Sequence, residues 1–119
     1  MCRRILVALC ILLMTACGGA ASQAPPGVRV VATEFHFEPS ALTLTAGAPM
    51  KLTFKNAGQT LHDFTIVSGP GGDKTLDHVA AEPNKEATLT LDLPAGSYTF
   101  ICSVPGHKEL GMQGTIAVQ

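Results

Sequence analysis

The sequence predicts an all-β fold, either a sandwich or a barrel of short strands. Over residues 28–119, apolar and polar side chains alternate with a period of two, which is the repeat of a strand buried on one face. Glycine, proline and asparagine interrupt this alternation at short intervals, as they do between the strands of sandwiches and barrels. No stretch shows a convincing helical repeat, so helices are not expected to build the core.

The individual strands follow from local composition. Residues 28–33 are rich in β-branched side chains, which favour strands. Residues 41–45 and 50–55 alternate strictly and end at glycine-containing turn sequences. Either a short helix or an irregular loop would fit residues 73–86, and we expect a loop. The remaining expected strands are 61–67, 87–93, 97–101 and 115–118.

The first sixteen residues predict a cleaved signal peptide. Two arginines precede an apolar run over residues 5–14, which is short for a membrane span, although a transmembrane anchor is the alternative. Small residues before Cys17 resemble a bacterial lipoprotein signal, which implies cleavage before Cys17 and lipid attachment to it. Ordinary signal cleavage would instead release a soluble exported protein. Either product would be periplasmic or lie at the outer face of the cell membrane.

Residues 17–27 are expected to form a flexible linker, because they consist mainly of small residues and proline. This linker would let a lipid-anchored domain stand off the membrane, and it leaves residues 28–119 as one folded domain. The chain of 119 residues has a formal net charge of −1 at pH 7 and no basic stripe. That charge pattern argues against nucleic acid as a partner.

Only one cysteine remains in the expected domain. Cys2 and Cys10 lie within the signal peptide and Cys17 is the expected lipidation site, which leaves Cys102. Exported proteins usually pair their cysteines, so a solitary one suggests a metal ligand or a reactive thiol. A buried structural thiol and an intermolecular disulfide through an unlipidated Cys17 are the alternatives.

Cys102 begins a run in which a histidine and a methionine follow at equal intervals. His107 is five residues after Cys102 and Met112 is five residues after His107, while His62 lies forty residues upstream. Two histidines, one cysteine and a weak axial methionine are the trigonal ligand set of an electron-transfer copper site. Because these residues stand at expected strand ends and on one return loop, we expect them to converge at one end of the fold. Glu109 is an alternative fourth donor, which would favour a harder metal.

The run Cys102-Ser103-Val104-Pro105-Gly106-His107 resembles the ligand loop of the cupredoxins, the blue copper proteins. The stretch from Phe35 to Ser40, Ala46-Gly47 and Asn56 are also similar to cupredoxin sequence, so the resemblance covers nearly all of residues 28–119. It implies a Greek-key β-sandwich that binds one copper ion at one end. Cys102 would supply the thiolate, His62 and His107 neutral imidazoles, and Met112 a long axial bond.

The resemblance also implies roles for three neighbours of the ligands. Asp63 and Ser103 would link the two ligand segments by a hydrogen bond, and the amide of Val104 would donate to the Cys102 sulfur. Asp63 stands where relatives usually have asparagine.

One-electron transfer between exported or membrane-bound proteins is the function that these features favour. Copper carriage or delivery on the same fold is the alternative. An enzyme is not expected, because the chain has only four histidines and no second cysteine near Cys102. We expect a monomer that meets its redox partners transiently, takes no small-molecule substrate, and exchanges electrons at the rim around His107, beside Pro105 and Leu110.

Overall fold

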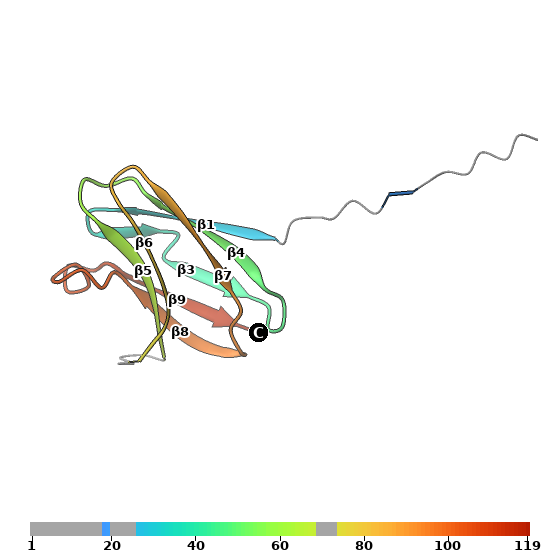
Figure 1. Cartoon of the computed structure of the whole chain (residues 1–119). Helices are drawn as coiled ribbons and strands as arrows, with labels where there is room; N and C mark the ends of the chain where they lie inside the picture. Colours follow the sequence, from blue (N-terminus) through green and yellow to red (C-terminus); the bar gives the residue numbers. More distant parts are fainter. Residues whose placement is uncertain (1–17, 20–25, 69–73) are drawn as a thin grey trace, which may run out of the picture.

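The computed structural model describes residues 18–19, 26–68 and 74–119. In these ranges the chain forms two β-sheets that pack face to face as a sandwich, and it contains no helix (Figure 1). One sheet has the strand order β2-β1-β4-β7 and the other the order β3-β9-β8-β5-β6. The predicted all-β sandwich is therefore confirmed.

The first sheet contains β1 (Gly27–Thr33), β2 (His36–Glu38), β4 (Met50–Asn56) and β7 (Glu86–Leu91). The second contains β3 (Ala41–Leu44), β5 (His62–Ser68), β6 (Thr75–Ala81), β8 (Gly96–Ile101) and β9 (Gln113–Val118). Most neighbouring strands are antiparallel, but β1 pairs in parallel with β4 and β3 pairs in parallel with β9. Parallel neighbours need a crossover connection. Here, between the two strands of each parallel pair, the chain forms at least one strand of the opposite sheet.

Two strands were not predicted. The expected loop over residues 73–86 was wrong, because β6 occupies Thr75–Ala81 and pairs antiparallel with β5. β6 lies at the edge of its sheet and only Ala81 is fully buried, so its sequence lacks a clear apolar face. β2 is three residues long, too short to show a repeat. The other expected strands are confirmed, with bounds that differ by two residues or fewer.

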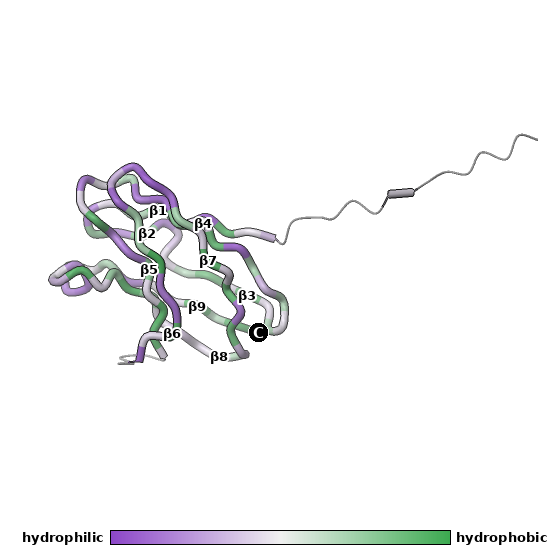
Figure 2. Tube along the Cα trace, viewed as in Figure 1, coloured by the Kyte–Doolittle hydropathy of each residue, from purple (hydrophilic) through white to green (hydrophobic). Residues whose placement is uncertain are grey.

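The core between the sheets is built around four phenylalanine rings. Phe37 and Phe54 come from the first sheet and Phe64 and Phe100 from the second, and all are almost completely buried. Phe64 and Phe100 stack with ring centroids 4.5 Å apart, and Phe37 meets Phe100 edge-on at 5.2 Å. Hydrophobic and hydrophilic residues interchange along the strands, as Figure 2 shows, because alternate side chains face the core.

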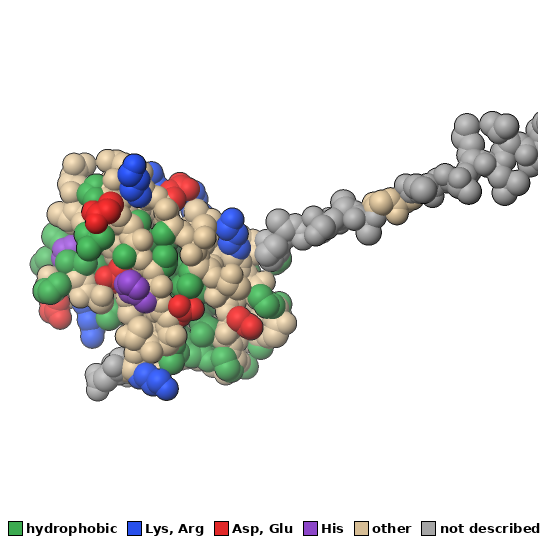
Figure 3. Space-filling view, in the orientation of Figure 1, with side chains coloured by type: hydrophobic (Ala, Val, Ile, Leu, Met, Phe, Trp, Pro, Cys, Tyr) green, Lys and Arg blue, Asp and Glu red, His purple; other side chains and the backbone are tan. Residues whose placement is uncertain are grey.

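Charged side chains lie at scattered positions on the surface. On the face drawn in Figure 3, acidic and basic groups are interspersed with uncharged side chains, without a large patch of one sign. No helix among the described residues is long and apolar enough to cross a membrane. The expected signal peptide and the lipidation site at Cys17 lie outside the described residues.

Candidate metal centre

The candidate site lies at one end of the sandwich, at or just beyond the ends of three strands. At each of these ends, a potential donor continues the row of side chains that faces the core. Along β5, His62 shares a face with the buried Phe64. After β8, Cys102 continues the row of Phe100, and before β9, Met112 precedes the row that contains Ile116. Side chains of a strand alternate between its two faces, and each potential donor is an even number of residues from a buried core residue. All three donors therefore point toward the interior at one end of the sandwich.

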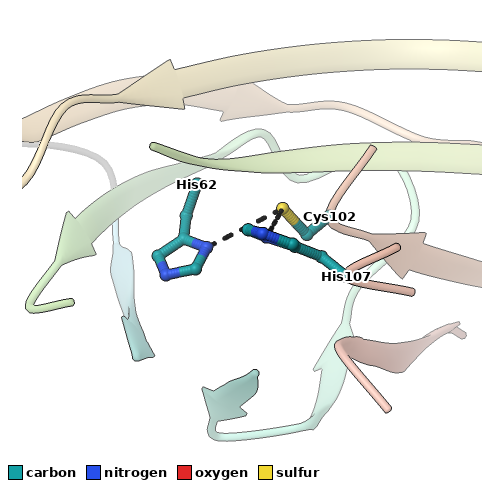
Figure 4. A group of neighbouring side chains, drawn as sticks. All are labelled: His62, Cys102 and His107. Atoms are coloured by element: carbon teal, nitrogen blue, oxygen red, sulfur yellow. Dashed lines mark hydrogen bonds between the residues drawn. The ribbon is translucent and has the colours of Figure 1, made fainter. Parts of the chain in front are cut away.

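Three donor atoms converge there. The Cys102 sulfur lies 3.4 Å from Nδ1 of His107 and 3.9 Å from Nδ1 of His62. The three ligating atoms lie within 4.8 Å of one another, and Figure 4 shows the side chains pointing toward a common centre. A sulfur and a nitrogen bound about 2.3 and 2.0 Å from one ion in a trigonal plane would lie roughly 3.7 Å apart. The spacing therefore fits donors that share a single ion.

Met112 is tied to the same centre through its backbone. The amide of Cys102 donates to the carbonyl of Met112, and the amide of Met112 donates to the carbonyl of His107, both at 3.1 Å. The Met112 side chain is completely buried and belongs to the cluster that includes Cys102. Glu109, the alternative fourth donor, is exposed and does not belong to the group of converging donors.

The loop between Cys102 and Met112 is a series of tight turns. His107 donates its amide to the carbonyl of Val104 at 3.1 Å, which closes the turn that presents the imidazole. Gly106 and Gly111 have φ values of 84° and 104°, a region in which other residues are strained. Both glycines are thus required for the chain to return from His107 to the strand that follows.

Asp63 links the two segments that carry the donors. Its carboxylate accepts hydrogen bonds from the Ser103 amide at 2.9 Å, the Ser103 hydroxyl at 2.7 Å and the Thr65 hydroxyl at 2.6 Å. The expected hydrogen bond between Asp63 and Ser103 is therefore present. Asp63 is 4% exposed, so these bonds satisfy a buried carboxylate and hold β5 against the loop that follows β8.

Burial favours the neutral forms of two donors. It raises the pKa of the Cys102 thiol, although hydrogen bonds from the backbone of Asp63 and Val104 lower the pKa in part. Burial also lowers the pKa of His62, which favours the neutral imidazole that binds metals. A thiol in this environment becomes a thiolate most readily when a metal cation compensates for its charge.

Sequence reasoning missed the turn between β1 and β2. Oε1 of Glu34 lies 3.4 Å from Nε2 of His62, on the side of the ring that faces away from Cys102. The ring of Phe35 meets the ring of His107 edge-on, with centroids 4.9 Å apart. Strand pairing and core packing between residues far apart in the sequence bring this turn to the site, so no local pattern could have identified it.

A family model described as a cupredoxin-like domain matches residues 5–118. The chain belongs to the cupredoxin-like family. The donor set agrees with this membership, because a thiolate, two imidazoles and a nearby methionine are typical of copper sites that transfer electrons.

Individual cupredoxins resemble the chain over most of its length. The copper-resistant cuproprotein CopI of Rubrivivax gelatinosus is 28% identical over 118 residues, covering 85% of this chain and 71% of that protein. Auracyanin-A of Chloroflexus aurantiacus is 27% identical over 147 residues, covering 90% and 89%. The solved structure of auracyanin A, titled a "blue" copper protein, has a TM-score of 0.71 at 26% identity and covers 81% of this chain and 100% of that one.

Auracyanin from Roseiflexus castenholzii has the same fold. Its structure has a TM-score of 0.72 at 22% identity, and the match covers 82% of this chain and 99% of that one.

Proposed function

We propose that this protein binds one copper ion through Cys102, His62 and His107, with Met112 as a weak axial ligand, and transfers single electrons between protein partners. One observation carries the proposal: a buried cysteine sulfur faces the Nδ1 atoms of two histidines at 3.4 and 3.9 Å. This mixed set of soft and borderline donors suits both Cu(I) and Cu(II), so the site need not rearrange on electron transfer.

The protein contributes rigidity and exclusion of water to this function. Cys102 and His62 are completely buried, and the hydrogen bonds of Asp63 fix the segments on which they lie. His62 begins β5, and backbone hydrogen bonds close the loop that carries the other three donors, which keeps the donors at fixed separations. Bound copper supplies the one-electron chemistry, and the chain maintains one geometry for both oxidation states.

Electron exchange is proposed to occur at the rim around His107. This histidine is only partly buried. Three exposed apolar side chains lie close to the donors: Leu110 (60% exposed) on the same loop as His107, Leu61 (41%) next to His62, and Phe35 (36%) against the His107 ring. A small apolar surface suits short-lived contacts with partner proteins. The role is that of an electron carrier rather than an enzyme, because only two of the four histidines lie at the site, where they supply donors for one ion.

Copper carriage is the second candidate function. It is favoured by the likeness to the copper-resistant cuproprotein CopI. A carrier must release its ion, whereas an electron carrier must retain it through both oxidation states.

Repeated reduction and oxidation of the copper-loaded protein separates these functions. After each cycle, the bound copper would be measured by elemental analysis of the protein separated from a Cu(I) chelator. Electron transfer predicts a reversible one-electron couple with copper retained. Quantitative loss of copper to the chelator on each reduction would instead support delivery.

We also propose that the protein is exported and anchored by a lipid at Cys17. The apolar run and the small residues before Cys17 support this location. Mass spectrometry of the amino-terminal peptide from membrane fractions tests it, with Cys17→Ser as the control. An unmodified Cys17 in a soluble fraction would contradict the anchor.

A further inference from the structure

We propose that Glu34 is a positioning residue for the copper site, which accepts a hydrogen bond from Nε2–H of His62 and thereby lowers the reduction potential. This inference rests on the proposed copper-binding function. Its starting point is an unsatisfied atom: Nε2 of His62 is buried and has no hydrogen-bond partner among the described residues, while Oε1 of Glu34 lies 3.4 Å away.

The Glu34 carboxylate is held in this place by the loop before β5. Its Oε1 accepts the backbone amides of Gln59 and Thr60, at 2.5 and 3.1 Å. The hydrogen bond from Gln59 lowers the pKa of Glu34, so the acceptor is a carboxylate at neutral pH. The side chain is 34% exposed, which leaves it far less free than a solvated surface glutamate.

Buried Asn56 in turn fixes the shape of this loop. Its side-chain amide donates to the carbonyls of Thr60 and Ala81 at 2.7 and 2.8 Å, and its Oδ1 accepts the amide of Gly58 at 2.8 Å. The position of the carboxylate is thus set by a hydrogen-bonded framework and not by one flexible side chain.

Gly58 provides the space in which the carboxylate and the imidazole meet. A Cβ at this position would lie 2.4 Å from Oε1 of Glu34 and 2.8 Å from Nε2 of His62. Any larger residue would therefore force the two groups apart. The close approach of a charged acceptor to the outer nitrogen of a proposed ligand depends on this glycine.

The consequence for the site follows from the chemistry of imidazole. A carboxylate that accepts Nε2–H keeps the proton on that nitrogen, leaves Nδ1 free for the metal and makes the ring a stronger donor. A stronger donor and a nearby negative charge both favour Cu(II) over Cu(I). Removing either effect should therefore raise the reduction potential.

Glu34→Gln tests the proposal, with Glu38→Gln as the matched control. Both variants remove one negative charge, but Glu38 is 75% exposed and contacts His36, which is not a proposed ligand. For Glu34→Gln we expect the ratio of Cu(II) to Cu(I) binding constants to fall about tenfold, a rise of about 59 mV in the potential of the copper-loaded protein. Equal potentials for the two variants would overturn the proposal.

Gly58→Ala separates the hydrogen bond from the charge, because it keeps Glu34 but pushes its carboxylate from His62. We expect its potential to rise in the same direction. A shift in Glu34→Gln without one in Gly58→Ala would mean that charge alone acts, contrary to the proposed hydrogen bond.

Nuclear magnetic resonance of the diamagnetic Cu(I) protein gives a readout that does not depend on the potential. We expect the His62 proton on Nε2 to exchange slowly with water in the wild type and faster in Gly58→Ala. A proton on Nδ1 would contradict the proposal. If the wild type forms no copper site, both the proposed function and this inference fail. If the wild type binds copper and Glu34→Gln has the same reduction potential as Glu38→Gln, only this inference fails.

Discussion

His62 shows how much a single residue depends on its surroundings. Its imidazole is completely buried, with Nδ1 facing Cys102 and Nε2 facing Glu34. Burial lowers its pKa, and the proximity of the Glu34 carboxylate only partly opposes that effect. The metal-free protein therefore maintains His62 as a neutral base, the form in which it can bind an ion.

A dependence of stability on pH follows for the metal-free protein. Below the ordinary histidine pKa of 6.5, the unfolded chain binds a proton at His62 more readily than the folded chain does. Stability rises with pH wherever the unfolded state binds more protons. The free energy of unfolding should thus decrease as the pH falls from 7 toward 5, in urea titrations of the metal-free protein.

His62→Gln is the control for this dependence. It should flatten the pH profile in this range, because the lowered pKa of Glu34 places its titration at more acidic pH. An unchanged slope in the variant would show that His62 is not the titrating group.

Sequence alone could identify the residues of the site that lie near one another along the chain. Cys102, His107 and Met112 share one loop, and Asp63 and Ser103 are adjacent to proposed ligands. Glu34 could not be found in this way. It is 28 residues from His62, and their approach depends on strand pairing and on the absence of a side chain at Gly58.

Gly114 illustrates a constraint at the scale of the strand. It is the second residue of β9 and lies opposite Phe100 of β8, where the buried ring lies across the space that a side chain would occupy. A Cβ there would also lie 2.4 Å from the carbonyl oxygen of Ser40, the residue just before β3, which pairs in parallel with β9. The glycine therefore allows three segments to meet just beyond Met112.

Gly114→Ala should destabilise the protein by roughly 1–3 kcal/mol, the usual cost of overpacking a core. The backbone oxygen of Ser40 cannot rotate away as a flexible side chain would. Denaturant unfolding of the metal-free protein measures the change. Gly19→Ala is the matched control, because no atom lies within 4 Å of its added Cβ, and an equal effect of the two changes would refute this explanation.

The strands that sequence could predict are those with one clearly apolar face. β4 places Leu52 and Phe54 toward the core between more exposed residues, so its alternation is plain. β6 could not be recognised, because an edge strand with one fully buried residue need not carry an apolar row. Its pairing with β5 is a tertiary contact that local composition does not encode.

The molecule as a whole presents its partly buried histidine within an apolar rim. Leu110 is the most exposed of the large apolar residues there, at 60%, and its backbone is held by hydrogen bonds to Gly106 and His107. The rim lies at the end of the sandwich where the donors converge, so a partner that docks here would approach the proposed copper ion closely.

Leu110→Glu should slow electron exchange with a redox partner about tenfold or more, since about 1.4 kcal/mol of lost docking or barrier energy changes a rate tenfold. The visible spectrum should stay unchanged, because Leu110 is not a proposed ligand. Stopped-flow kinetics measures the rate. A shifted spectrum together with an unchanged rate would place Leu110 in the metal site and not at the docking surface.

The fold class could be predicted for the whole molecule because the alternation recurs in most strands and supplies the buried residues of the core. Four phenylalanines, drawn from both sheets, fill its centre. The order of the strands within the two sheets, including the two parallel pairs, was not evident from local sequence. That arrangement places β5, β8 and β9 together and so determines where the donors meet.

Titration of the metal-free protein with Cu(II), followed by visible absorption and electron paramagnetic resonance, tests the central claim most directly. We predict an intense thiolate-to-copper band with a narrow hyperfine splitting, which saturates at one equivalent of copper and is absent in Cys102→Ser. A protein that stays pale, or one whose copper signal is the same in Cys102→Ser, would contradict the proposed site.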